Sequence, residues 1–455
     1  MAGAPKNNVF YRNQRWRYPR IVRGSGIYLQ DEDGNVYIDA CSGSAVANLG
    51  HGNREVAEFA REQMERIAFT HLSRWTVDTI ERCAADVSRW TPGDLDHVYF
   101  LSGGSEATET AIKMARQYFV ERDGHKAGKW KIISKHNSFH GNTLGALSMT
   151  GVVERRTVYN PLLINFPKIP QFYHYRNPWG CRTLKETSVK AAEALEEEIL
   201  REGPEHIAGF ISEPVVGAAC PGVHPEPVYF EMVREICDRY DVLLILDEVM
   251  AGFGRTGKNF GIDHFGVVPD IMTIAKGMSC GYTPIGATIT TDRIHDAIMN
   301  HGSGSFVHGH TYAGNPLSCG IAAKVLEILE RDRVVENAAQ QGEYLLGRLA
   351  ELKELPIVGD VRGKGLLLGV ELVRDGASKE PFAFDEGARG VVTEECLAAG
   401  VVVYPGGGTA DNVNGDHFLL APPLNITREE VDDLFTRLRA GLEKSSAALL
   451  GGKAQ

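Results

Sequence analysis

Long apolar runs are missing from this chain of 455 residues. No uninterrupted hydrophobic stretch approaches the roughly 18–20 residues that a membrane-spanning helix needs, which excludes a protein built on such helices. An excess of positive charge is missing too, because 48 Lys and Arg face 59 Asp and Glu, for a formal net charge of −11. We therefore expect no general electrostatic attraction to nucleic acid or to an anionic membrane surface, and no partner of either kind.

Cysteines are few and widely spaced: there are 8, and none forms a C-x-x-C pair. In a chain long enough to bury a core, scattered cysteines are typical of a reducing compartment, where each packs as a small hydrophobic residue. The first 30 residues lack the apolar segment of a secretory signal. They are rich in Arg but poor in Ser, which favours an ordered N-terminal arm over a transit peptide. We expect a cytoplasmic protein.

The remaining composition, with 43% hydrophobic and 24% charged residues, is that of a folded globular chain and excludes disorder or a coiled coil. A β-hairpin is predicted over 27–39, around Asp33-Gly34. Further along, buried strands alternate with helices, which is typical of an α/β fold with a mostly parallel sheet. Strands are predicted at 98–101, 131–134, 208–212 and 242–246, and helices at about 54–69, 189–201, 227–240, after 320 and at 427–447.

Three residues, Gly103-Gly104-Ser105, follow the first buried strand and open a helix. Two glycines allow the backbone to approach an anion closely, and the first N–H groups of the helix point toward it. The pattern therefore predicts a phosphate site. A plain helix-capping turn without a ligand is the alternative.

An acidic pair, Asp247-Glu248, ends the apolar strand at 242–246. Carboxylates at that end of a parallel strand lie where open α/β sheets bind ligands. A helix N-cap is the alternative here. The segment 252–258 also matches the phosphate-binding loop of nucleoside triphosphatases, but Asn259 stands where Ser or Thr should hold magnesium. No separate strand leads into that loop, so nucleotide hydrolysis is the weaker interpretation.

Lys276 lies among small and apolar neighbours, in the sequence Ile-Ala-Lys-Gly-Met. Partial desolvation would lower the pKa of its amine and free it as a nucleophile. The alternative is a lysine whose amine reaches out to water. His136 and His140 are four residues apart and could share a metal ion on a helix, but the intervening Asn137-Ser138 indicates a loop, and we predict no metal site.

Seven motifs in order, spanning residues 36 to about 427, resemble the class III (omega) aminotransferases. This family consists of pyridoxal-phosphate enzymes with the aspartate-aminotransferase fold, also called fold type I. The motifs are SGGSEATE at 102–109, SFHG at 138–141, SEPV at 212–215, LDEVMAGFGRTG at 246–257, AKGMSCGYTPIG at 275–286, HTYAGNP at 310–316 and APP at 421–423.

The resemblance implies an α/β protein with a large, mostly parallel sheet domain at 72–320, which binds pyridoxal 5′-phosphate. Residues 1–71 and 321–455 would form a smaller α+β domain. The implied reaction moves an amino group from a primary (omega-type) amine or amino acid to a keto acid such as pyruvate, in a ping-pong cycle between the pyridoxal and pyridoxamine forms. A decarboxylase, racemase or aminomutase of the same fold is the alternative.

The resemblance also implies roles for individual residues. Lys276 would carry the cofactor as a Schiff base and shuttle the proton of the reaction, and Asp247 would pair with the pyridine nitrogen. Thr311 would reach the phosphate bound by a second subunit, which implies a homodimer or a dimer of dimers. The remaining expected cofactor contacts are Gly103, Gly104 and Ser105 at the phosphate, Phe139 and Val249 on the two faces of the ring, and His140 and Glu213 beside it.

Two departures from the family pattern concern the substrate. Many relatives keep an arginine just before the Pro-Pro pair to bind a substrate carboxylate, yet residues 406–420 contain none. An arginine elsewhere would have to replace it; the candidates are Arg12, Arg15, Arg17 and Arg20 of the N-terminal arm, and Arg74. Second, Ser44-Ala45 stands where relatives acting on aryl amines often carry a bulky pair, which predicts a roomier pocket.

Overall fold

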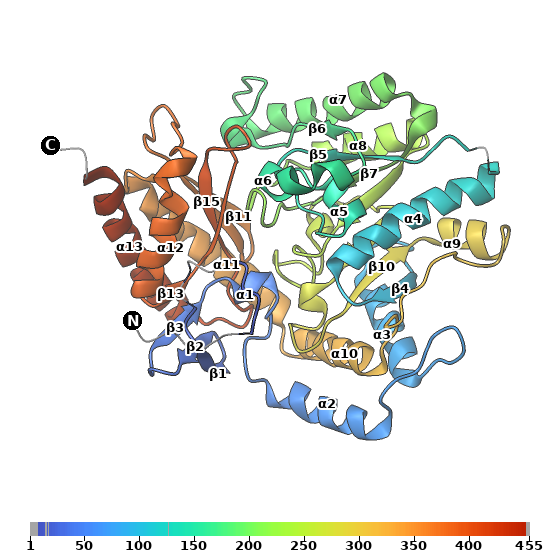
Figure 1. Ribbon diagram of the computed structural model, residues 1–455, viewed down its shortest axis with the longest axis horizontal. Coiled ribbons are helices and arrows are strands. Elements are labelled where there is room, and N and C mark those ends of the chain that lie inside the picture. The colour runs from blue at the N-terminus through green and yellow to red at the C-terminus, as the bar shows by residue number, and fades with distance from the viewer. Residues whose placement is uncertain (1–7, 14–15, 17, 126, 452–455) are drawn as a thin grey trace.

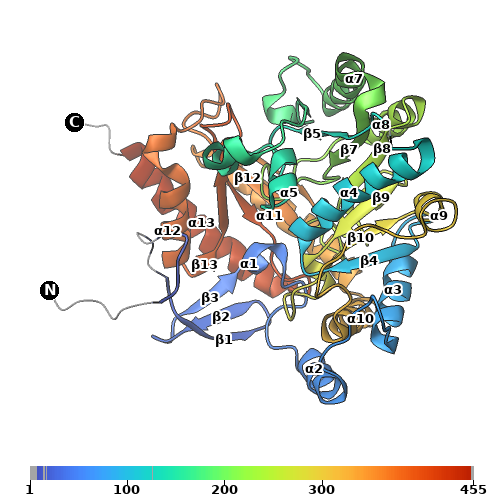
Figure 2. The same cartoon turned by 45° about the vertical axis from the view of Figure 1, so that its right-hand side comes forward.

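A computed structural model describes residues 8–13, 16, 18–125 and 127–451 (Figure 1). In this part of the chain the strands form one seven-stranded sheet and two four-stranded sheets. Figures 1 and 2 show the first and last parts of the chain, blue and red, on one side of the molecule. The large sheet and its helices, cyan to yellow, lie on the other side.

The seven-stranded sheet is mixed but mostly parallel, as predicted. Neighbouring strands pair in parallel from β9 to β6, whereas β10 runs antiparallel to both β9 and β4. The residues of β7, β8 and β9 are all buried, because helices cover both faces of the sheet. In spatial order the strands are β4 (His97–Leu101), β10 (Gly286–Thr290), β9 (Ile271–Ile274), β8 (Leu243–Asp247), β7 (Ile207–Ser212), β5 (Lys131–Lys135) and β6 (Lys168–Ile169).

Helices pack around this sheet and against one another. α4 lies against β9 and β10, whereas α7 and α8 pack together and α10 packs on α2 and α3. α7 begins at Leu184, before the predicted start at 189, behind a capping box in which Thr183 and Glu186 satisfy each other's backbone N–H groups. The helices of this part are α2 (Arg54–Arg66), α3 (Asp78–Trp90), α4 (Gly104–Asp123), α5 (Leu144–Met149), α6 (Val153–Arg156), α7 (Leu184–Glu202), α8 (Val228–Arg239), α9 (Asp292–Met299) and α10 (Pro316–Arg331).

The two smaller sheets combine the ends of the chain. Strand β13 pairs in parallel with β3, with Val401 opposite Ile38, so residues far apart in sequence share one sheet. One sheet contains β1 (Ile21–Ser25), β2 (Tyr28–Asp31), β3 (Val36–Asp39) and β13 (Val401–Val402); the other contains β11 (Val358–Lys364), β12 (Leu367–Leu372), β15 (Asp416–Leu420) and β14 (Tyr404–Gly407). The accompanying helices are α1 (Ser42–Ala45), α11 (Val334–Ala350), α12 (Ala388–Ala398) and α13 (Arg428–Leu450).

The pairing of β13 with β3 agrees with one unit built from both chain ends, whereas α10 packs on α2 and α3 beside the large sheet. The division into 72–320 as one domain, and 1–71 with 321–455 as the other, stays a proposal. The predicted hairpin, the four buried strands and the five helical segments are all present, with ends that differ by a few residues. The sequence analysis did not predict β9 and β10. The eight cysteines are unpaired, and all except Cys181 are buried. No helix within the described ranges is long and apolar enough to cross a membrane.

Candidate active site

Lys276 follows β9 directly and opens a single turn of 3₁₀ helix, Lys276–Met278. Its φ of 45° is left-handed, a conformation that costs a non-glycine residue about 1–3 kcal/mol and that clusters at functional sites. Burial lowers the pKa of the amine, and the nearby negative charges of Asp247 and Glu213 oppose that shift. Among the residues that the structure describes, no atom accepts a hydrogen bond from Nζ. The side chain is partly buried, and its amine, free of a hydrogen bond to any described residue, is available as a nucleophile.

Asp247, the last residue of β8, is buried and held in one orientation. Its Oδ2 lies 2.8 Å from Nδ1 of His140, and its Oδ1 accepts the Val249 N–H at 3.0 Å. The backbone N–H of His140 in turn donates to Oγ1 of Thr150 at 2.9 Å. Turns rather than a helix follow Asp247, so the N-cap alternative is wrong. These two contacts fix the direction in which the carboxylate points.

Glu213 follows β7 and joins the same group. Its carboxylate accepts the backbone N–H of Phe139 at 3.2 Å and that of Gly217 at 3.0 Å. Burial raises the pKa of Glu213, while the His140 side chain opposes the shift. The carboxylate thus fixes the backbone of Phe139 next to the Asp247–His140 pair.

The turn at 103–105 leads into α4, which is 20 residues long. No side chain caps this helix, and the N–H groups of Gly104, Ser105 and Glu106 bond to no atom in the described ranges. A Cβ on Gly104 would lie 2.8 Å from Cγ1 of Val249, so only glycine allows this close packing. Free N–H groups at the positive end of a long helix suit a phosphate.

The other two sequence alternatives are also resolved. Residues 252–258 form a series of turns, and only a four-residue 3₁₀ helix, Gly261–His264, follows them. Arg255 is fully buried and bonded to Asn48 and to the Leu366 carbonyl, so a nucleotide-binding loop is wrong. His136 and His140 lie in a loop, as predicted. His136 is close to Lys168 and Arg156, whose positive charges help to lower its pKa after burial.

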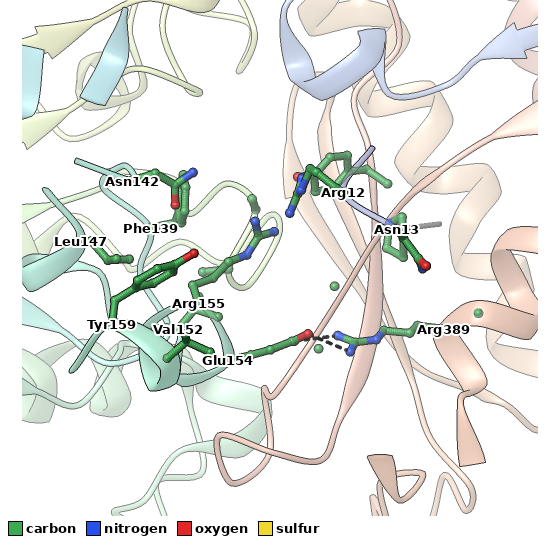
Figure 3. Close-up of a pocket in the computed structure, with 18 of the residues that line it drawn as sticks. Arg12, Asn13, Phe139, Asn142, Leu147, Val152, Glu154, Arg155, Tyr159 and Arg389 are labelled. Atoms are coloured by element: carbon green, nitrogen blue, oxygen red, sulfur yellow. Dashed lines mark hydrogen bonds and ion pairs between the residues drawn. The ribbon is translucent and has the colours of Figure 1, made fainter. Parts of the chain in front are cut away.

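A cavity of about 1120 Å³ opens beside Phe139, between the two sides of the molecule (Figure 3). Residues around α5 and α6 form one wall, α12 and β14 form the other, and Arg12, Asn13 and Trp16 of the N-terminal arm contribute to the rim. An ion pair joins the walls: Arg389 binds Glu154 through two nitrogen–oxygen contacts of 3.0 and 3.2 Å. Phe139, whose backbone N–H bonds to Glu213, links the cavity to the group of Lys276, Asp247 and Glu213, although these three residues do not line it.

Comparison with known proteins agrees with this geometry. A family model described as Aminotransferase class-III matches residues 11–442. The chain is a class III aminotransferase.

Two curated relatives illustrate the range of the family. The putrescine–pyruvate aminotransferase of Pseudomonas aeruginosa is 35% identical over 440 residues, or 94% of this chain and 91% of that protein. The taurine–pyruvate aminotransferase of Rhodobacter capsulatus is 36% identical over 438 residues, or 94% and 92%. A solved structure, an (S)-enantioselective omega-transaminase from Thermomicrobium roseum, matches with a TM-score of 0.89 and 40% identity, covering 98% of this chain and 96% of that one. The aminotransferase therefore has the predicted fold type I and depends on pyridoxal phosphate.

The site residues fit this cofactor. The uncapped end of α4 suits the phosphate, the buried Asp247 carboxylate suits a protonated ring nitrogen, and the unpartnered Lys276 amine suits a Schiff base. Of the sequence-predicted residues, only Thr311 stands apart: it is exposed on the surface of this single chain.

Sequence reasoning missed several residues of the site. Thr150, which holds the His140 backbone, and the cavity residues Glu154, Arg155 and Arg389 carry no motif. Their contacts are with residues that lie at other positions along the chain and that only the fold brings close. Of the arginines considered for a substrate carboxylate, Arg12 lines the cavity and Arg20 pairs with Glu32 at 3.5 Å. Arg15 and Arg17 lie outside the described residues.

The Ser44-Ala45 segment occupies an unexpected position. Ala45 is 2% exposed, has a φ of 55°, and packs in a small apolar cluster with Val215 and Leu419. It does not line the cavity itself. Tyr404 and Ala218 pack against this cluster and do line the cavity, so Ala45 influences the cavity shape through them.

Proposed function

We propose that this aminotransferase takes the amino group of a primary amine whose carboxylate, if any, is remote, and passes it to a keto acid such as pyruvate. The observation that carries the proposal is the buried group of Lys276, Asp247 and Glu213 beside a large cavity of mixed character. Residues 406–420 supply no arginine for an α-carboxylate. Both curated relatives described above are named for pyruvate, which supports that acceptor.

In this proposal the chain holds the cofactor through the residues predicted from sequence. The N–H groups at 103–105 would bind the phosphate, and Phe139 and Val249 would enclose the ring. Asp247 would keep the ring nitrogen protonated, and His140 and Val249 keep Asp247 oriented. The bound cofactor supplies an electron sink for bonds at the carbon that bears the amine. Lys276 would release the cofactor to the substrate and then carry the proton between substrate and cofactor atoms.

A half-reaction tests this function. Holoenzyme mixed with an amine donor alone should lose its near-visible absorption band and accumulate the pyridoxamine form, and pyruvate should then restore the band. A panel of donors and acceptors read in this way identifies the preferred pair. A racemase or decarboxylase of the same fold would convert the substrate without accumulating the pyridoxamine form, and that result would overturn the proposal.

We further propose a homodimer with shared sites, or a dimer of dimers. Thr311, which would serve the neighbouring subunit, is exposed, and apolar side chains surround it. The rings of Phe69 and Tyr312 meet edge to face at 5.9 Å, and Leu72 packs on Gly314; all three side chains are exposed. An exposed apolar patch of this kind is typical of a protein interface.

Mixing two inactive variants tests the shared site. Lys276→Ala and Thr311→Ala chains, after confirmed subunit exchange, should regain activity, because each hybrid dimer contains one site with both native residues. Random exchange should restore about one quarter of wild-type activity, since half of the dimers are hybrids with one native site. Activity that never exceeds the parents would show that Thr311 serves its own subunit.

A variant at Ala45 tests the cavity shape. Ala45→Trp should weaken bulky donors by about 1–3 kcal/mol, because the ring displaces Tyr404 and Ala218 toward the cavity. The melting temperature should also fall, since the ring must enter a packed cluster. Ala45→Gly suits the positive φ, adds no volume and should keep the donor range. The kcat/KM values for a small and a bulky amine measure the effect; a folded Ala45→Trp enzyme with unchanged selectivity would contradict it.

A further inference from the structure

The cavity carries more positive charge than its own carboxylates balance. Three arginines line it, Arg12, Arg155 and Arg389, but Glu154 is the only carboxylate among its described lining residues. The lining side chains therefore carry three positive charges and one negative charge. A concave site with an unbalanced charge attracts a ligand of the opposite sign. The question is which arginine is available to an anion.

Arg389 is already occupied. Glu154 binds it through two contacts, and the Asp416 carboxylate lies 4.0 Å from its Nε and accepts its backbone N–H. An incoming anion would have to displace Glu154 and would meet repulsion from Asp416. Arg389 therefore serves as a link between the two walls.

Arg155 is different, because it has no carboxylate partner in the described part of the chain. It is half-buried, and its guanidinium lies over the Phe139 ring, with Cζ 5.6 Å from the ring centroid. Figure 3 shows Arg155 reaching into the cavity toward Arg12, whose exposed side chain has no carboxylate partner among the described residues either. Two guanidinium groups that approach each other without an intervening carboxylate repel, and an anion between them removes that repulsion.

We infer that Arg155, assisted by Arg12, forms an anion subsite that binds the remote carboxylate or sulfonate of the amine donor. This inference rests on the proposed function, in which Phe139 lies on the cofactor ring. Phe139 then separates Arg155 from the reacting carbon. The bound anion is accordingly several bonds away from the amine, and it is not an α-carboxylate.

The skeleton between the two ends of the donor has an apolar path. Leu147, Val152 and Tyr159 line the cavity on the same side as Arg155 and leave no charged group along that wall except Glu154, which Arg389 neutralises. A donor of this class has an amine at one end, an apolar chain, and a monoanion at the other end.

Two donors that differ only in the anion test this subsite. 5-Aminopentanoate and 1-aminopentane are each mixed with the holoenzyme without acceptor, and the loss of the cofactor absorption band gives an apparent second-order rate constant. Wild-type enzyme should prefer 5-aminopentanoate. Arg155→Met should lower its rate constant about 10- to 100-fold, the size expected for losing a hydrogen bond to a charged group, and change that of 1-aminopentane less than about twofold.

Further variants separate charge from packing. Arg155→Lys keeps the positive charge and should recover part of the lost rate, and Arg12→Met should cause a smaller loss because Arg12 is exposed. Arg20→Met is the matched control: it removes an exposed arginine of the same arm, outside the cavity lining, and should change neither donor.

The outcomes distinguish this inference from the proposed function. Equal losses for both donors in Arg155→Met would mean that Arg155 only supports Phe139, and an unchanged donor ratio would mean that it binds no substrate anion. A wild-type preference for 1-aminopentane would also overturn the subsite while leaving the aminotransferase function intact. If wild-type enzyme formed the pyridoxamine form with no amine in a broad panel, the proposed function would fail, and the subsite would fail with it.

Discussion

Lys276→Ala should abolish multiple turnover, with kcat falling by about 10⁴-fold, the upper end of what proton transfer by a positioned side chain contributes. The variant loses the amine that interacts with both Asp247 and Glu213, and with it the expected covalent attachment and proton carrier. Purified wild-type enzyme should show a near-visible band that borohydride reduction fixes to Lys276, detectable as a mass increase on one peptide. The variant should show neither the fixed mass nor the turnover.

The chain offers a matched control in its other deeply buried lysine. Lys135 is fully buried, burial lowers the pKa of its amine strongly, and its Nζ lies 3.6 Å from the centroid of the Phe172 ring without a hydrogen-bond partner in the described ranges. Lys135→Met should retain the reducible band and most of the turnover. Turnover and a reducible imine that persist in Lys276→Ala would show that the assignment is wrong.

Asp247→Asn should reduce kcat by about 10²–10³, the usual loss when a preorganised electrostatic partner is removed. The loss should appear mainly in kcat, because the carboxylate stabilises the charge that develops on the cofactor ring during the reaction. The dissociation constant of pyridoxal phosphate should change much less, since the phosphate contacts at 103–105 remain. Single-turnover kinetics with an amine donor, together with a cofactor titration, separate the two quantities.

Glu248→Gln is the control for this change. The Glu248 carboxyl group accepts the N–H groups of Gly261 and Ile262, and burial raises its pKa to about 8. Near neutral pH it is therefore largely uncharged, as an amide is, although the amide NH2 cannot accept the second backbone N–H. Its kcat should fall far less than that of Asp247→Asn. Equal losses in the two variants, or an unchanged kcat in Asp247→Asn with the cofactor bound, would contradict the role of Asp247.

Local signals explain why much of the site could be predicted. The strand, glycine turn and helix around 103–105 are contiguous, and Asp247 ends a strand whose apolar residues precede it directly. Lys276 follows a strand that the sequence did not reveal, but its motif still identified it. These predictions needed only neighbours within a few residues, so the order of residues along the chain carried the information.

The partners of those residues could not be predicted, because they come from distant parts of the chain. His140 and Asp247 are 107 residues apart, and Glu154 and Arg389 are 235 residues apart. The positive φ of Ala45 and its place in a packed cluster also depend on Val215 and Leu419, which other elements supply. No period or motif encodes such contacts.

The sequence by itself determined the α/β class and the family, and it led to the prediction of Lys276 as the reactive lysine, because strand patterns and motifs are properties of contiguous residues. The tertiary structure decided which carboxylate fixes which backbone, which arginine is neutralised, and that Arg155 faces the cavity without a carboxylate. The physical reason is that a charge acts through space, over distances of a few ångströms. Only the folded chain sets those distances.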